Sequence, residues 1–222
     1  MAKKTAVKSE HEVELMDIQA NVKHMLVTIE GDGDLILNKM NARNERWLTG
    51  GRDNGVVERP NIWEDIITSI HWRDSVNCED TYTQCDEEMM HRLLKENKPC
   101  ISAFAFKKSF CDAVFRNEID KNKTKIDTAI NVVANGGLVP TEFGGWSVER
   151  RLMNPKRNSP ITVHLNHFHN WKATFQIDYM DHVFSRDQIL NIINLAGFGL
   201  GIGSGRSSGY GRYHITNVEV FE

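Results

Sequence analysis

Near its C-terminal end the chain alternates glycine with other residues, and this stretch limits the possible folds more than any other. Glycine occupies every second position from 197 to 205 and returns at 209 and 211, within the segment AGFGLGIGSGRSSGYGRYHI (residues 196–215). Glycine is favoured where the backbone takes a positive φ or approaches another group closely. A flexible surface loop or a tight turn is one interpretation, but seven glycines exceed what a turn requires. The spacing instead predicts a loop whose backbone N–H groups converge on an anion such as a phosphate.

The side chains of this loop suit contacts with phosphates and bases. Arg206 lies in the gap between the glycines, beside Ser207 and Ser208, and Arg212 follows the last glycine. Guanidinium groups are forked donors that suit phosphate oxygens, and the ring of Tyr210 offers a face on which a base can stack. We therefore predict a nucleic-acid contact that includes Gly201, Gly203, Gly205, Arg206, Ser207, Ser208, Gly209, Tyr210, Gly211 and Arg212.

Two well-known nucleotide-binding patterns do not fit this loop. A dinucleotide-binding G-x-G-x-x-G loop lies between a strand and a helix, whereas this loop follows a predicted helix and precedes the last predicted strand. A Walker loop needs Gly-Lys followed by Ser or Thr, and residues 196–215 contain no lysine. Both patterns are therefore excluded.

The segment from Gly201 to Gly211 resembles the glycine-rich signature of the RAMP superfamily. It reads Gly-Ile-Gly, five residues that include Arg206, and then Gly-Tyr-Gly, which matches the signature at every defined position. Members of this superfamily are RNA-binding proteins of CRISPR systems and their relatives. The resemblance implies one or two ferredoxin-like domains, binding to RNA, and copies of the chain arrayed along one nucleic acid.

Hydrophobic periodicity elsewhere predicts an α+β fold with the ferredoxin-like βαββαβ order, as in RRM domains. Alternating apolar and polar residues predict strands, and apolar residues at helical spacing predict helices. The second core helix begins with a capping box, because Gln188 follows Ser185 by three residues. The six core elements are expected at residues 22–30 (β), 101–119 (α), 129–134 (β), 171–178 (β), 185–196 (α) and 212–221 (β).

The predicted domain organisation is one RAMP-like domain over residues 22–222, preceded by a mobile polar arm over residues 1–21. Two insertions into the core are expected, at residues 31–98 and 140–170. In the RAMP superfamily, comparable insertions form lobes and a thumb that kinks the bound RNA. The resemblance therefore makes the second insertion the candidate thumb.

The second insertion is predicted to contain a projecting hairpin with a basic tip. Two runs, 148–153 and 161–168, can pair as strands across a polar loop. Basic side chains here are expected to follow a single nucleic-acid strand, and a tryptophan is expected to stack on bases. The residues concerned are Trp146, Arg150, Arg151, Lys156 and Arg157.

Composition limits the partners and the compartment. The formal net charge is −3, so nucleic-acid binding would need a local basic patch, and 40% hydrophobic residues are enough for a sizeable core. The four cysteines form no C-x-x-C pair and follow no secretory signal, which favours reduced thiols in a cytoplasmic protein. No apolar run predicts a membrane span.

Few residues are candidates for catalysis. Some RAMP proteins cleave RNA without a metal, using an early histidine as the base, and His24 and His71 are the weak candidates here. The histidines His164, His167 and His169 raise the question of zinc, but no cysteine or suitable glutamate lies at ligand spacing. No Ser-His-Asp or Cys-His grouping is apparent. We therefore expect no metal and no cofactor.

The sequence favours a non-catalytic protein that binds single-stranded nucleic acid, and the resemblance points to RNA rather than single-stranded DNA. The expected assembly is a homo-oligomer or a multi-subunit ribonucleoprotein, with no membrane involved. Two alternatives remain open. One is a metal-independent endoribonuclease of the kind that cleaves CRISPR repeats, and the other is a protein-interaction module on the same fold, which the near-neutral charge favours.

Overall fold

The core of the structure has the predicted βαββαβ order. The computed structural model describes residues 22–40, 61–76, 85–153 and 161–221. The core elements are β1 (Val22–Gly31), α5 (Ala103–Arg116), β5 (Ile130–Val133), β9 (Lys172–Met180), α7 (Arg186–Gly199) and β10 (Tyr213–Phe221). In the main sheet β1 lies between β10 and β9, β5 pairs with the other edge of β9, and all these pairs are antiparallel. This confirms the ferredoxin-like α+β fold class.

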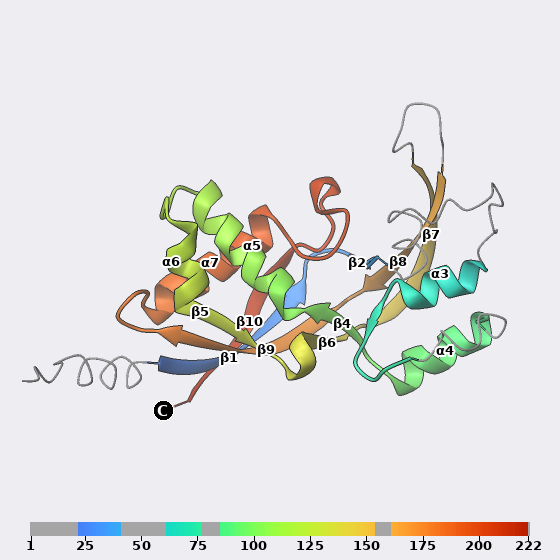
Figure 1. The fold of residues 1–222 in the computed structure, drawn as a ribbon, viewed down its shortest axis with the longest axis horizontal. Helices are drawn as coiled ribbons and strands as arrows, with labels where there is room; N and C mark the ends of the chain where they lie inside the picture. Colours follow the sequence, from blue (N-terminus) through green and yellow to red (C-terminus); the bar gives the residue numbers. More distant parts are fainter. Residues whose placement is uncertain (1–21, 41–60, 77–84, 154–160, 222) are drawn as a thin grey trace, which may run out of the picture.

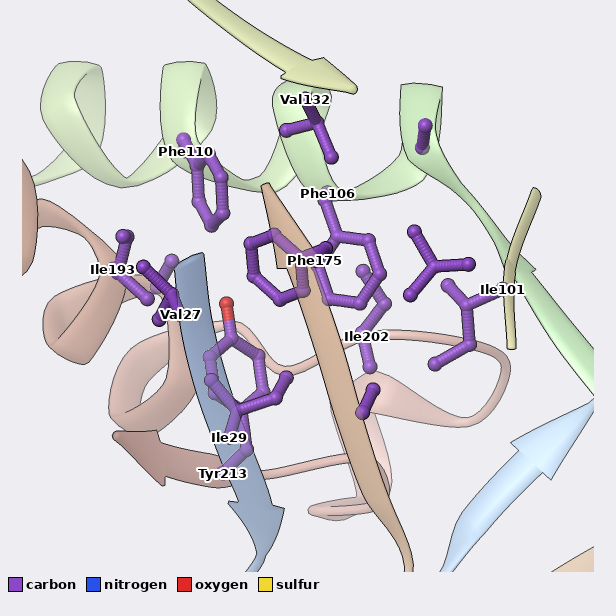
Figure 2. Packing of buried hydrophobic residues seen from close by; sticks show 14 of the residues in the cluster. Val27, Ile29, Ile101, Phe106, Phe110, Val132, Phe175, Ile193, Ile202 and Tyr213 are labelled. Carbon is purple, nitrogen blue, oxygen red and sulfur yellow. The ribbon is translucent and has the colours of Figure 1, made fainter. Parts of the chain in front are cut away.

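Helices α5 and α7 cover one face of the main sheet, and the hydrophobic core lies between the two layers (Figure 1). Alternate residues of β1, namely Met25, Val27 and Ile29, are fully buried, as expected for a strand with one face in the core. Aromatic rings from helix and sheet meet in this core, where the centroids of Phe106 and Phe175 lie 4.5 Å apart. Figure 2 shows these rings beside Val27 and Ile29.

Further elements are added between the core elements. Before α5 the chain forms β2 (Leu35–Leu37), α3 (Ile62–Thr68), β3 (His71–Trp72), α4 (Glu87–Glu96) and β4 (Pro99–Ser102). After α5 it forms α6 (Lys123–Ala129), and after β5 it forms the short helix η1 (Asn135–Gly137), β6 (Leu138–Glu142), β7 (Gly145–Met153) and β8 (Ile161–His169). None of the helices in the described ranges is both long and apolar enough to cross a membrane.

Some of these added strands extend the main sheet, and the others form a second sheet. Strands β6, β4 and β3 extend the main sheet, whereas β2, β8 and β7 form a separate antiparallel sheet. The predicted pairing of two strands around residues 154–160 is thereby confirmed, although the loop itself lies outside the described residues. Because β6 belongs to the main sheet, the hairpin begins at Gly145 rather than at the start of the expected 140–170 insertion.

The three-stranded sheet has two different faces. Trp146 pairs with Phe168 on one face, and Ser147 pairs with His167 on the other. The first face packs against α3, since the side chain of Asn166 donates a hydrogen bond to the main-chain oxygen of Ile66. The second face lies against the glycine-rich loop, and we call it the loop face. It carries Ile36, Ser147, Glu149, Arg151, His167 and His169.

Replacing Asn166 with alanine should lower the free energy of unfolding by about 2 kcal/mol, because buried polar groups would lose their partners. Asn166 is fully buried, and its amide donates to the Ile66 oxygen and to Ser69 Oγ, both at 3.0 Å. Its own oxygen accepts the indole N–H of Trp146 at 3.0 Å. Urea unfolding would measure the loss, with the exposed Asn131→Ala as the control expected to change stability little.

Candidate nucleic-acid interface

The glycine-rich loop runs from the end of α7 to the start of β10 (Figure 1). Main-chain hydrogen bonds hold it on both sides. The Gly211 N–H donates to the Asp34 oxygen at 2.8 Å, and the Ser204 N–H donates to the Ile36 oxygen at 2.8 Å. Across the loop itself, the Ile202 N–H donates to the Gly211 oxygen at 2.9 Å. The loop is therefore fixed against the segment that joins β1 to β2 and against β2 itself.

Close backbone approach explains two of the glycines. Gly211 has a φ of +68°, and a Cβ at this position would lie 1.9 Å from the Ile202 oxygen. Gly197 lies within α7, where a Cβ would lie 2.1 Å from the Tyr213 oxygen, so α7 can pack against β10 only through a glycine. Both positions exclude any side chain, because real Cβ atoms essentially never come so close to backbone. Part of the glycine pattern thus serves packing within the protein.

The middle of the loop projects a short exposed turn, which we call the loop tip (residues 205–209). Its three central residues, Arg206, Ser207 and Ser208, form one turn of 3-10 helix and are all exposed. Within the described parts of the chain, the Arg206 guanidinium has neither an ion-pair partner nor a hydrogen-bond acceptor. The tip therefore presents a full positive charge and two hydroxyl groups to solvent.

The main-chain N–H groups of the loop are divided between internal bonds and solvent. Those of Gly201, Gly209 and Gly211 donate to oxygens of the protein itself, so these three are not open to an anion in this structure. Arg212 is likewise engaged, since its Nη1 donates to the Phe198 oxygen at 2.6 Å and links the end of α7 to β10. The positive charge that a ligand can reach is thus that of Arg206 at the loop tip, because Arg212 and several glycine N–H groups are used within the protein.

Tyr210 and Arg151 meet where the loop crosses the loop face. The guanidinium carbon of Arg151 lies 5.8 Å from the centroid of the Tyr210 ring, within the range of a cation–π contact. The same ring stands edge-on to His167, with centroids 5.2 Å apart. Arg151 also donates two hydrogen bonds to Glu149, at 2.8 and 2.7 Å, so its charge is partly neutralised.

The other predicted contact residues are separated from this group. Arg150 is exposed but belongs to the face opposite the loop face, because it pairs with His164. Trp146 is half-buried on that opposite face, with its indole N–H bonded to Asn166 and its ring edge-on to His91. The predicted contacts Lys156 and Arg157 lie outside the described residues.

The two histidines considered as catalytic bases also lie elsewhere. His24 pairs with Phe221 at the end of β1 that is remote from the glycine-rich loop, and its Nδ1 lies 2.7 Å from Asp178. His71 is half-buried in β3, where burial, with a smaller contribution from Lys39, lowers its pKa. Neither lies beside the loop tip, so neither is placed to act on a strand bound there.

A polar network on the loop face was not foreseen from the sequence. His167 Nε2 lies 3.0 Å from Glu149, and its Nδ1 lies 3.3 Å from Asp34. Asp34 also lies 2.7 Å from Nδ1 of His169, whose Nε2 is 2.9 Å from Ser147 Oγ. Of the three histidines weighed as zinc ligands, His167 and His169 thus bond to carboxylates and a hydroxyl, whereas His164 Nδ1 is buried without a hydrogen-bond partner among the described residues. The described residues contain no group of ligands arranged for a metal ion. The alternation of side chains along strands could predict that residues 147, 149, 167 and 169 share one face. It could not place Asp34 beside them, because Asp34 lies in the turn between β1 and β2.

The charges in this network lower the pKa values of its carboxyl groups. For Asp34, partial burial opposes ionisation, but hydrogen bonds with His169 and His167 outweigh it and hold the pKa below the ordinary value. For Glu149, the hydrogen bonds from Arg151 are the largest cause of a lowered pKa, and His167 adds to them. Both carboxylates are therefore ionised at neutral pH.

Stability should fall in acid partly through Glu149. Its pKa is lower in the folded state than the ordinary value of 4.5, so its contribution is complete above that pH and is lost as the pH falls through the folded-state value. The difference in Tm between wild type and Glu149→Gln should shrink between about pH 6 and about pH 3. Thermal unfolding of both proteins across this range would check it, and a constant difference would contradict this role of Glu149.

The face of the main sheet opposite α5 and α7 is not suited to a polyanion. Strand register places Glu30, Asp178 and Glu219 on this face, together with Lys172. The Lys172 ammonium already lies 3.7 Å from Glu30, which leaves an excess of negative charge among the described residues of this face. Phosphates would be repelled here, in contrast to the loop tip.

No known protein family and no curated protein matches the sequence. Among solved structures, one similar chain belongs to a type III-B Cmr-beta complex bound to cognate target RNA, with 13% identity and a TM-score of 0.46. The match covers 95% of this chain and 64% of that one, so the present chain spans less than two thirds of its length. A second is Cmr6 from Pyrococcus furiosus, with 10% identity, a TM-score of 0.37, and coverage of 88% of this chain and 99% of that one.

Proposed function

We propose that this protein binds single-stranded RNA through the loop tip and the adjacent ring of Tyr210. The observation that carries the proposal is Arg206, an exposed cation without a partner among the described residues, at the tip of a loop fixed by main-chain bonds. An exposed guanidinium beside the hydroxyl groups of Ser207 and Ser208, on a backbone held by hydrogen bonds, supplies the donors that phosphate oxygens accept. The fixed loop also limits the conformational entropy lost on binding.

Two further observations support this location. Tyr210 lies next to the loop tip in a half-buried position, and its ring contacts Arg151 and His167. The ring is therefore already ordered for stacking against a base of the bound strand. The acidic face of the main sheet would repel a phosphate backbone, whereas the loop tip carries the positive charge of Arg206. The RAMP-like signature favours RNA as the polymer and several copies or subunits in one ribonucleoprotein.

Fluorescence anisotropy of labelled oligonucleotides would test the proposal. Affinity for single-stranded RNA should exceed that for single-stranded DNA and fall steeply with salt, because phosphate contacts release counterions. The RNA should be recovered intact, since the two early histidines His24 and His71 both lie away from the loop tip. Failure to bind either polymer at low salt would contradict the proposal, and a cleaved RNA would revive the endoribonuclease alternative.

A protein partner remains the second candidate, because α7 exposes an apolar surface. Phe198 is 83% exposed and borders a groove of about 580 Å³. The groove is lined by Ile119, Phe184, Gln188, Asn191, Ile192, Asn194, Leu195 and Phe198. A Phe198→Ser variant that keeps its RNA affinity but loses self-association, measured by sedimentation, would assign this surface to contacts between copies.

A further inference from the structure

Ser147, His169 and Asp34 are arranged as a hydrogen-bonded series on the loop face. Ser147 Oγ lies 2.9 Å from Nε2 of His169, and Nδ1 of the same ring lies 2.7 Å from Oδ1 of Asp34. A nucleophile within hydrogen-bond distance of a base, itself oriented by a third group, is the geometry of an activated serine. Such a triad is recognised by geometry and roles, because its members occur in different orders on unrelated folds.

The hydrogen positions follow from these contacts. Asp34 is an ionised acceptor, so the hydrogen of a neutral His169 ring belongs on Nδ1, facing the carboxylate. The lone pair of Nε2 then faces Ser147, whose hydroxyl can donate to it. Ser147 is exposed, so a small molecule can reach its oxygen from solvent.

The rest of the network holds Asp34 in place. The second oxygen of its carboxylate lies 3.3 Å from His167, which in turn lies 3.0 Å from Glu149. Glu149 accepts two hydrogen bonds from Arg151, and the main-chain oxygen of Asp34 accepts the Gly211 N–H. A base held by a supported carboxylate is preorganised for proton transfer rather than free to rotate.

We propose that Ser147 is a reactive nucleophile toward small uncharged esters of carboxylic acids, with His169 as its general base and Asp34 as the positioning residue. In the first step Ser147 Oγ bonds to the ester carbonyl carbon, its proton passes to His169 Nε2, and the proton then goes to the leaving alcohol as the ester C–O bond breaks. Water, with His169 again as base, next cleaves the acyl-serine and releases the carboxylic acid. The carboxylates of Asp34 and Glu149 favour a neutral substrate over an anionic phosphate ester. This inference does not depend on RNA binding.

A fluorophosphonate probe on the full-length protein tests this directly. Ser147 Oγ should displace fluoride from phosphorus, and peptide mass spectrometry should locate the label on Ser147. The label should be absent in Ser147→Ala and present in the control Ser75→Ala, which alters an exposed serine away from the network. In His169→Gln the labelling rate should fall on the order of 100-fold, the usual scale for loss of a general base.

The role of Asp34 has its own spectroscopic test. Ring nitrogen NMR should place the hydrogen of His169 on Nδ1 in the wild type and should show a redistribution toward Nε2 in Asp34→Asn, with an unchanged circular dichroism spectrum. Hydrolysis of p-nitrophenyl acetate by the wild type should exceed that by Ser147→Ala. A wild type that the probe leaves unlabelled at Ser147, or an equal labelling rate in His169→Gln, would overturn the proposal.

Discussion

Gly211→Ala should lower the free energy of unfolding by at least ~3 kcal/mol. The new Cβ would lie 1.9 Å from the Ile202 oxygen, so the backbone of the loop must move. That movement disturbs the hydrogen bonds that join Gly211 to Ile202 and to Asp34, each worth about 1 kcal/mol. The φ of +68° adds a further cost of about 1 kcal/mol for a residue with a side chain. Urea unfolding followed by circular dichroism would measure the loss.

Gly209→Ala is the matched control for this prediction. Gly209 also has a positive φ, of +88°, but a Cβ there would meet nothing within 4 Å. Only the conformational cost remains, and we expect a loss of about 1 kcal/mol. Equal losses in the two variants would show that the close approach at Gly211 does not control the stability of the loop.

Arg206→Glu should weaken the binding of single-stranded RNA at least tenfold at moderate salt, equivalent to about 1.4 kcal/mol or more. The substitution replaces the exposed cation of the loop tip with an anion that repels phosphate. The slope of log affinity against log salt should also fall by about one, because one phosphate contact no longer releases its counterion. Anisotropy titrations at several salt concentrations would give both quantities.

Lys108→Glu provides the control for charge. Lys108 is exposed on α5, and its replacement changes the net charge of the protein by the same amount as Arg206→Glu. If binding depends on the loop tip, Lys108→Glu should reduce affinity much less than Arg206→Glu. Equal reductions would mean that overall charge, rather than the loop tip, governs affinity.

Local periodicity predicted the core elements well because each carries its own pattern. Helix α7 begins where the capping box predicted, with Ser185 and Gln188 bonded reciprocally. Elements defined by tertiary pairing were missed. Residues 99–102 form a strand because they pair with β6, so the helix expected from residue 101 begins at Ala103. Helix α6 was missed for a local reason: residues 121–125 have the composition of a basic loop, but the Asn122 side chain accepts the Thr124 N–H and the helix begins at Lys123.

The candidate site also combines features that a local sequence pattern predicts with features that only tertiary structure creates. The loop glycines and Arg206 form a local pattern that the sequence reveals, and the structure adds that several of the glycine N–H groups are used internally. The series Ser147–His169–Asp34 could not be foreseen, because Asp34 follows β1 while the other two residues lie on paired strands more than a hundred residues later. Only the docking of β2 onto β8 brings the turn before β2 beside His169.

Ultraviolet cross-linking of the protein to single-stranded RNA, with mass spectrometry of the linked peptides, would locate the RNA-binding surface. We expect cross-links within the glycine-rich loop, at or beside Tyr210, and their loss in Arg206→Glu. Cross-links on β1, β9 or β10 of the acidic sheet face, with none in the loop, would contradict RNA binding at the loop tip.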